Sequence, residues 1–316
     1  IMGHQRGEYD IIHPNNHVNL SQSTNDVYPT ALRIALNYTV QRLKGAMKGL
    51  SSAFLAKGEE FADILKMGRT QLQDAVPMTL GQEFDAFGQM ISEDISRMDE
   101  LLPLLNEINM GATAIGTGLN AHPRYNDMVR KHLEEITGLP LVTARNLVEA
   151  TQDTGAYVHV SSVMKRFAIK LSKICNDLRI LSSGPRAGIN EINLPPAQPG
   201  SSIMPGKVNP VIPEVVNQVA YEVIGNDLTI TLAAEAGQLQ LNVMEPVIAW
   251  SVFKSINHLR QACIVLAERT VKGITANRDV ARNYVDRSIG VVTALLPRIG
   301  YVKATEIAKE AIKSGK

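Results

Sequence analysis

Apolar residues recur every three or four positions over long stretches of the chain, the spacing that places them on one face of an α-helix. A polar, turn-rich segment, residues 1–22, precedes the first stretch, and Thr24–Asp26 provides a plausible N-cap. The helix predicted to follow has an apolar face made of Leu32, Leu36, Val40, Leu43, Met47 and Leu50.

Further helices are predicted along the rest of the chain. The second has a near-heptad spacing, typical of a helix packed lengthwise against others, and Pro103 should kink it near its end. Its face comprises Leu80, Phe84, Phe87, Ile91, Ile95, Met98, Leu102 and Leu105. The third carries Val160, Val163, Met164, Phe167, Leu171, Ile174 and Leu178, and two more occupy roughly residues 211–240 and 244–273.

Irregular stretches separate these helices at residues 66–77, 110–120 and 182–210, and no alternating strand pattern of useful length is present. The sequence therefore predicts an all-α fold, a long-helix bundle with a small C-terminal helical unit. We divide the chain into 1–22, the remnant of an N-terminal domain, 23–273, the central bundle, and 274–316, a partial C-terminal helical domain. Both ends look truncated, because the chain begins at Ile1 and stops directly after a helical stretch.

Composition excludes several classes of function. With 316 residues, 45% of them hydrophobic, the chain can bury a large core. A formal net charge of +1 and the lack of a basic stripe argue against a nucleic-acid partner, and no apolar run approaches membrane-spanning length. Cys175 and Cys263 lie far apart in apolar helical patterns, which indicates a reducing compartment and a cytoplasmic protein.

The strongest chemical signal is the run Gly200–Pro210, which we call the serine loop. It contains two adjacent hydroxyls, two glycines, a lysine and an asparagine, and Pro205 with Gly206 excludes a helix interior. Its backbone N–H groups, hydroxyls and ammonium can converge on an anion. A flexible glycine-serine linker is the alternative, but linkers rarely interleave Ile, Met and Val with their glycines.

Two other polar segments lie near helix ends, Ser21–Asp26 and Gly68–Asp74. Alone, each is weak evidence, since a Ser/Thr/Asn cluster before a helix is usually a cap and an arginine before a polar turn is usually a surface group. Together with the serine loop, they resemble the three motifs of the aspartase/fumarase superfamily, in the family's order. Gly111–Asn120 and Ser183–Gly188 extend the resemblance.

The resemblance implies a homotetramer in which segments of three subunits meet at each active site. It also implies elimination from a 2-substituted succinate, whose carbanion needs preorganised donors and cations. By resemblance, Ser201 is the general base and lies on a mobile loop. The same resemblance implies that Lys207 and Asn209 bind one substrate carboxylate, and that Ser23, Thr24 and Ser202 bind the other. It also implies that Asn25, Thr70 and Gln71 surround the leaving amino group. Glu214 would support Gln71, although a helix N-terminal carboxylate is an equal alternative.

The resemblance implies no organic cofactor, and divalent-metal activation cannot be read from the sequence. No His/Cys/Asp cluster has metal-ligand spacing, so no metal site is predicted. Gln71 favours the aspartase branch and hence the conversion of L-aspartate to fumarate, because fumarases usually carry histidine there and an amide can hold an amine. Two alternatives stay open: a class II fumarase acting on L-malate, and a catalytically silent structural oligomer, since a further N-terminal substrate contact of the family is absent.

Overall fold

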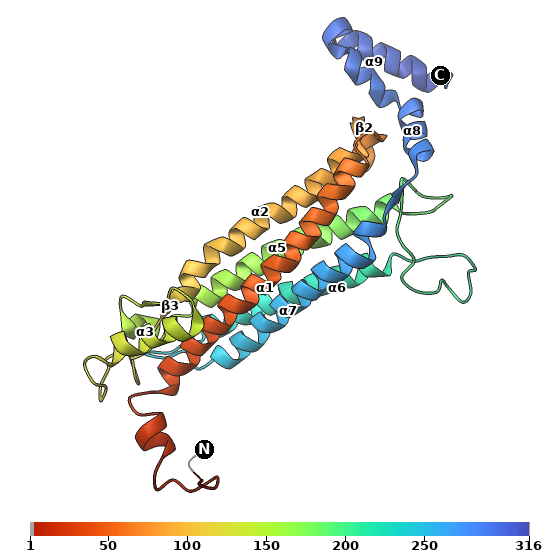
Figure 1. The fold of residues 1–316 in the computed structure, drawn as a ribbon. Helices are drawn as coiled ribbons and strands as arrows, with labels where there is room; N and C mark the ends of the chain where they lie inside the picture. Colours follow the sequence, from red (N-terminus) through yellow and green to blue (C-terminus); the bar gives the residue numbers. More distant parts are fainter. Residues whose placement is uncertain (1–2, 316) are drawn as a thin grey trace. The chain divides into compact units, whose positions relative to one another are not determined.

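The computed structural model describes residues 3–315, and α-helices account for most of that part of the chain (Figure 1). The long helices are α1 (Thr24–Glu60), α2 (Leu80–Asn106), α5 (Gly155–Leu181), α6 (Val211–Glu235) and α7 (Glu245–Arg269). The shorter ones are α3 (Tyr125–Thr137), α4 (Leu147–Ala150), α8 (Arg278–Arg287) and α9 (Leu296–Ser314), with helical turns η1 (Pro14–Val18), η2 (Val271–Gly273) and η3 (Ile289–Leu295). The predicted all-α fold is confirmed.

The long helices begin and end close to the predicted positions. All six residues of the predicted first face are buried in α1. On α2, Ile95 and Leu102 are only partly buried, and Asp94 and Leu101 take the buried positions instead. The spacing of the buried residues along α2 alternates steps of three and four throughout. Asp94 is tolerated at a buried position because Lys170 Nζ lies 3.5 Å from its carboxylate.

The prediction of an irregular stretch at residues 66–77 was wrong, because most of this segment is β-strand. β1 (Leu65–Thr70) and β2 (Gln73–Thr79) form an antiparallel hairpin with an irregularity between Met67 and Arg69. Two short pairs accompany it, β3 (Glu107–Ile108) with β4 (Val142–Thr143) and β5 (Ile192–Asn193) with β6 (Thr275–Ala276). The hairpin escaped detection because consecutive residues of β1, including Lys66, are buried, so no apolar-polar alternation marks it.

The chain divides into two compact units, each assembled from distant segments. Residues 1–44, 96–166 and 221–258 make the first unit, and residues 45–95, 167–220 and 259–316 make the second. Each long helix contributes one part to each unit. The domain boundaries after residues 22 and 273 remain predictions. Residues 1–2 and 316, which belong to the two terminal domains, lie outside the described part of the chain.

In the first unit, polar side chains join the helices at buried positions. Arg33 of α1 donates to the carbonyl oxygens of Leu104 and Glu107, over 2.8 and 2.7 Å. Asp227 of α6 accepts a hydrogen bond from Ser161 of α5 over 2.7 Å. These bonds satisfy buried polar groups and fix how the helices of this unit meet.

In the second unit, an aromatic cluster packs α1 against α2. Phe61 meets Phe84 edge-on with ring centroids 5.2 Å apart, and Phe54 and Phe87 complete the cluster. Each fully buried Phe contributes on the order of 2 kcal/mol by removing apolar area from water, so this cluster is a main source of stability for the unit. A buried hydrogen bond joins two further helices of this unit, because Asn217 of α6 donates to Ser172 Oγ of α5 over 2.8 Å.

None of the helices in residues 3–315 combines the length and apolar character needed to cross a membrane. The stretch from Ser182 to Pro210 is irregular apart from the two residues of β5, as predicted. The polar segment before α1 is also irregular, but it includes the helical turn η1.

Candidate active site

The first predicted segment forms the N-terminal turn of α1. Ser23 Oγ accepts a hydrogen bond from the N–H of Asn25 over 3.2 Å, and Asp26 Oδ1 accepts one from the N–H of Ser23 over 2.9 Å. These two hydrogen bonds cap the N-terminus of α1 and satisfy backbone donors there. Thr24 lies exposed in the same turn, where the helix dipole favours an anion.

Asn25 is oriented by contacts on both sides. Its Nδ2 donates to the carbonyl oxygen of Ala114 over 2.7 Å, and its own carbonyl oxygen accepts from Asn109 Nδ2 over 3.0 Å. The side-chain amide oxygen Oδ1 is then available to accept a hydrogen bond from an ammonium or amine. The side chain of Asn25 therefore has a defined acceptor at the start of α1.

Asp26 ties this turn to the glycine-rich loop that follows β3. Its Oδ2 accepts hydrogen bonds from the N–H groups of Gly111 and Thr113, over 3.1 and 2.9 Å. Burial raises the pKa of this carboxyl, and the backbone donors oppose that rise. Thr113 has a φ of 57° and a buried hydroxyl without a hydrogen-bond partner, so strain is stored where the loop meets the turn.

The second predicted segment is the tip of the β1–β2 hairpin. Thr70 pairs with Gln73, and the two residues between them, Gln71 and Leu72, have φ angles of 54° and 62°. Two positive φ angles are the mark of a type I′ turn, which normally takes Asn or Gly. Thr70 and Gln71 are exposed, so the strained turn presents their side chains to solvent.

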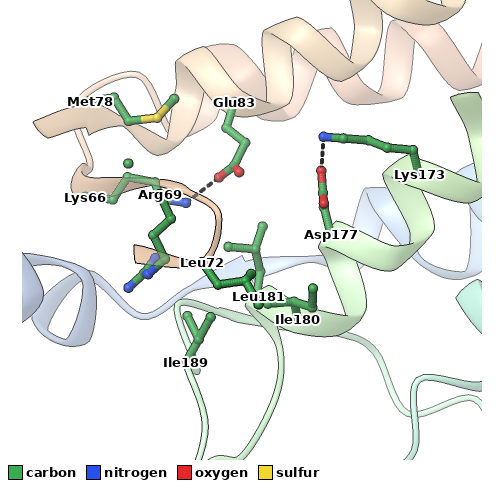
Figure 2. A pocket seen from close by; sticks show the side chains of 11 residues that line it. Lys66, Arg69, Leu72, Met78, Glu83, Lys173, Asp177, Ile180, Leu181 and Ile189 are labelled. Atoms are coloured by element: carbon green, nitrogen blue, oxygen red, sulfur yellow. Dashed lines mark hydrogen bonds and ion pairs between the residues drawn. The ribbon is translucent and has the colours of Figure 1, made fainter. Parts of the chain in front are cut away.

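One side of the hairpin borders a cavity of about 180 Å³ (Figure 2). Side chains of the hairpin, of α2 and of α5 line it, and its charged groups are already paired, Lys66 with Glu83 and Lys173 with Asp177. No residue of the predicted substrate set lines this cavity.

The third predicted segment, the serine loop, closes on itself. The N–H of Ser201 donates to the carbonyl oxygen of Lys207 over 3.2 Å. Ser201 Oγ accepts hydrogen bonds from the N–H groups of Ile203 and Met204, over 3.3 and 3.1 Å. A Cβ on Gly200 would lie 2.3 Å from the carbonyl oxygen of Lys207, so the ring requires glycine there.

The charged and amide groups of the serine loop lie at its surface. Lys207 is exposed, so its ammonium is accessible to an anion. Asn209 is half-buried where the loop leads into α6. Glu214 lies in the first turn of α6, as its alternative role as a helix N-terminal carboxylate requires.

The structure brings some predicted residues together and separates others. Ser201, Ser202 and Lys207 share one ring, and Thr70 and Gln71 share the hairpin tip. The serine loop and the hairpin tip both belong to the second unit, but no hydrogen bond joins them within residues 3–315. Ser23, Thr24 and Asn25 belong to the first unit. In the described part of the chain, no cluster of three metal-ligating side chains is present.

One set of residues near the hairpin tip was missed from the sequence. Arg69 forms an ion pair with Glu191 over 2.8 Å, and the carboxylate of Glu191 is fully buried. The two residues are 122 positions apart, and no local pattern marks either as a partner of the other. A buried acid in an irregular stretch can be found only once the fold is known.

Comparison with known proteins assigns the family. A model described as Lyase matches residues 1–225, and one described as Fumarase C C-terminus matches residues 291–316. The aspartate ammonia-lyase of Helicobacter pylori (strain ATCC 700392 / 26695) is 62% identical over 313 residues, covering 99% of this chain and 67% of that protein. The chain thus spans about two thirds of the length of this relative.

Solved structures agree with this assignment. A fumarate lyase:delta crystallin from Brucella melitensis, bound to cobalt, has a TM-score of 0.96 and 56% identity, covering 99% of this chain and 68% of that one. A class II fumarase from Schistosoma mansoni has a TM-score of 0.92 and 35% identity, covering 97% and 67%. Motifs, fold and relatives all lead to one conclusion: the chain belongs to the lyase family of the aspartase/fumarase superfamily.

Proposed function

We propose that the protein is an aspartate ammonia-lyase, which eliminates ammonia from L-aspartate to give fumarate in a reversible reaction. The observation that carries the proposal is the closed serine loop, in which two backbone N–H groups point at Ser201 Oγ. The identity to the Helicobacter pylori aspartate ammonia-lyase, 62%, exceeds the 35% identity to the class II fumarase and favours ammonia over water as the leaving group.

Ser201 is the proposed general base. A neutral serine hydroxyl is a very weak base at neutral pH, so it needs help to act as an alkoxide. Hydrogen bonds from Ile203 and Met204 stabilise the charged form of the oxygen and lower the cost of removing its proton. The alkoxide keeps one further lone pair for the proton on C3 of L-aspartate, beside the C4 carboxylate.

The remaining residues bind the two carboxylates and the amino group. Removal of the C3 proton places a second negative charge on the C4 carboxylate, and Lys207 with Asn209 is suited to stabilise a carboxylate of this kind. Ser23, Thr24 and Ser202 offer hydroxyl donors, two of them at the N-terminus of α1, to the other carboxylate.

Asn25, Thr70 and Gln71 are proposed to surround the leaving amino group. Amide and hydroxyl oxygens accept hydrogen bonds from an ammonium, and neither group competes with it for a proton. Collapse of the carbanion then breaks the C2–N bond, forms the double bond of fumarate and releases ammonia. Glu214 is proposed to support Gln71 from the first turn of α6.

The site is proposed to be complete only in a homotetramer. An exposed apolar stripe on α6, formed by Tyr221, Ile224, Leu228 and Leu232, supports association with further copies of the chain. Trp250 of α7, with 70% of its surface exposed, adds to the exposed apolar area of the first unit. A cytoplasmic location is also proposed, and the free thiols of Cys175 and Cys263 support a reducing compartment.

The test is fumarate formation by the full-length protein, followed by ultraviolet absorbance, from L-aspartate and separately from L-malate. Turnover of L-aspartate alone supports the proposal. Turnover of L-malate alone would identify a fumarase despite Gln71, and a tetramer inactive on both would favour the silent structural role.

A further inference from the structure

A buried ionic cluster lies under the hairpin in the second unit. The carboxylate of Glu191 is fully buried, with Arg69 Nη1 2.8 Å from Oε1 and Lys66 Nζ 2.9 Å from Oε2. Lys66 also pairs with Glu83 of α2. Buried charges persist only when they are paired in good geometry, so removal of Glu191 would leave two cations without their shared partner.

Glu191 is itself held rigidly by its backbone. Its N–H donates to the carbonyl oxygen of Leu181 over 2.9 Å, and its carbonyl oxygen accepts from the N–H of Asn277 over 2.9 Å. These bonds connect the end of α5 and the approach to α8 through one residue. The backbone that carries this carboxylate is therefore held in place within the second unit.

Arg69 is constrained on a second side by an aromatic ring. Its guanidinium carbon lies 5.0 Å from the ring centroid of Tyr284 in α8, within the range of a cation–π interaction. Tyr284 in turn donates from its hydroxyl to the carbonyl oxygen of Gly188 over 3.3 Å. The arginine side chain is thus clamped between a buried carboxylate and a ring.

Arg69 directly precedes the strained tip of the hairpin. It pairs with Asp74 across the ladder, Thr70 pairs with Gln73, and Gln71 with Leu72 has positive φ. Gln71 and Leu72 are residues that disfavour this conformation, so such a turn persists only when its surroundings over-determine it. Arg69, held by Glu191, can impose that constraint from one strand, and Asp74, which accepts a hydrogen bond from Ser288 Oγ over 2.7 Å, can impose it from the other.

From this arrangement we infer that Glu191 is a positioning residue, which acts through Arg69 to hold Thr70 and Gln71 at the angle the elimination needs. The inference rests on the proposed function for the reaction, but the anchoring of the hairpin stands apart from it. Small displacements of a positioned group cost large factors in rate, since the bound geometry must approach the transition state.

The experiment compares Glu191→Gln with the matched control Glu83→Gln in the full-length protein. Both variants remove one carboxylate from Lys66, but only the first releases Arg69. We expect Glu191→Gln to lower kcat/KM for L-aspartate at least tenfold and Glu83→Gln to stay within threefold. Equal activity of Glu191→Gln and the wild type would overturn the inference.

A double-mutant cycle separates positioning from general stability. If Glu191 acts through the hairpin tip, adding Glu191→Gln to a variant that lacks both tip side chains, Thr70→Ala with Gln71→Ala, should change kcat/KM by less than threefold. A full tenfold further loss on that background would contradict the inference, because the two effects would then be independent.

Hydrogen exchange over Leu65–Thr79 gives a readout that does not depend on the reaction. Glu191→Gln should accelerate exchange in this hairpin at least tenfold relative to Glu83→Gln, whatever the substrate is. Arg69→Lys, which keeps the charge but loses the planar fork, should do the same if Glu191→Gln does not fold. Unchanged exchange would remove Glu191 from this role, whereas loss of turnover in the wild type alone would count only against the proposed function.

Discussion

The backbone N–H of Met204 donates a hydrogen bond to Ser201 Oγ over 3.1 Å, inside a ring that the Ser201 N–H closes on the Lys207 carbonyl. This geometry places a backbone dipole where the negative charge of an alkoxide would form. The arrangement is built by the loop alone, so it exists before substrate arrives. The base proposed at Ser201 would therefore be prepared by contacts within its own loop.

Gly200→Ala tests whether the ring matters. The added Cβ would lie 2.3 Å from the Lys207 carbonyl oxygen, so the ring must open. We expect kcat for L-aspartate to fall at least tenfold, by about 1.4 kcal/mol or more in activation free energy, with an unchanged urea midpoint. Gly206→Asn is the control, since Asn tolerates the φ of 81° and no atom lies within 4 Å of the added Cβ. An equal loss of kcat in Gly206→Asn would contradict a role for the closed ring.

Gln71→Ala tests the contact to the leaving amino group. Loss of one hydrogen bond to a charged group should lower kcat/KM for L-aspartate by about tenfold to a hundredfold. Gln73→Ala, two residues along in the same exposed turn, should stay within threefold. If both variants lose the same activity, the turn as a whole matters and the amide of Gln71 has no separate role.

Leu228→Asp tests the apolar stripe on α6. Leu228 is 61% exposed in the single chain, and a carboxylate placed there should oppose burial against another copy. Light scattering after size-exclusion chromatography should show species smaller than a tetramer and a loss of activity. Ile136→Asp, at an 80% exposed residue of α3, should leave the tetramer intact. A tetrameric Leu228→Asp would exclude this stripe as the interface.

The parts of the fold that follow from periodicity were predictable from sequence. The buried apolar face of α1 was predicted residue by residue, because its six apolar residues recur at helical spacing. The hairpin was not, since Gln71 and Leu72 carry none of the Asn or Gly signal of a type I′ turn. Tertiary anchoring overrides local propensity at that turn.

The candidate site shows the same division. Ser201 and Lys207 were identified by a long motif, and the structure adds the hydrogen bonds that a motif cannot give. Glu191 could not be identified, because its importance lies in a contact with Arg69 across 122 residues. That Ser23, Gln71 and Ser201 meet in one site remains a prediction, since the proposed site combines segments of different subunits and one chain holds only its own.

Glu245 should make stability depend on pH. Burial raises the pKa of its carboxyl from 4.5 to about 7, against the opposing charge of Arg33. The folded state favours the protonated form of this carboxyl. The contribution of Glu245 to the free energy of unfolding is therefore fully present below about pH 4.5 and is lost as pH rises through about 7. Glu245→Gln should therefore raise the free energy of unfolding at pH 8 by on the order of 1 kcal/mol and change it little at pH 5.

Urea denaturation at fixed protein concentration measures this effect. Glu268→Gln is the control, because that carboxylate lies exposed on the same helix in a surface pair with Lys272. The control should show no gain at pH 8. A Glu245→Gln variant that follows the wild type at both pH values would contradict the assignment.

The most direct test of the central claim is fumarate formation from L-aspartate by the full-length wild type and by Ser201→Ala, each verified as a folded tetramer. The account predicts turnover by the wild type and a loss of at least a thousandfold in kcat for Ser201→Ala, since no other group replaces the base. Wild-type turnover that Ser201→Ala retains would contradict the account, because proton removal would then depend on a different residue.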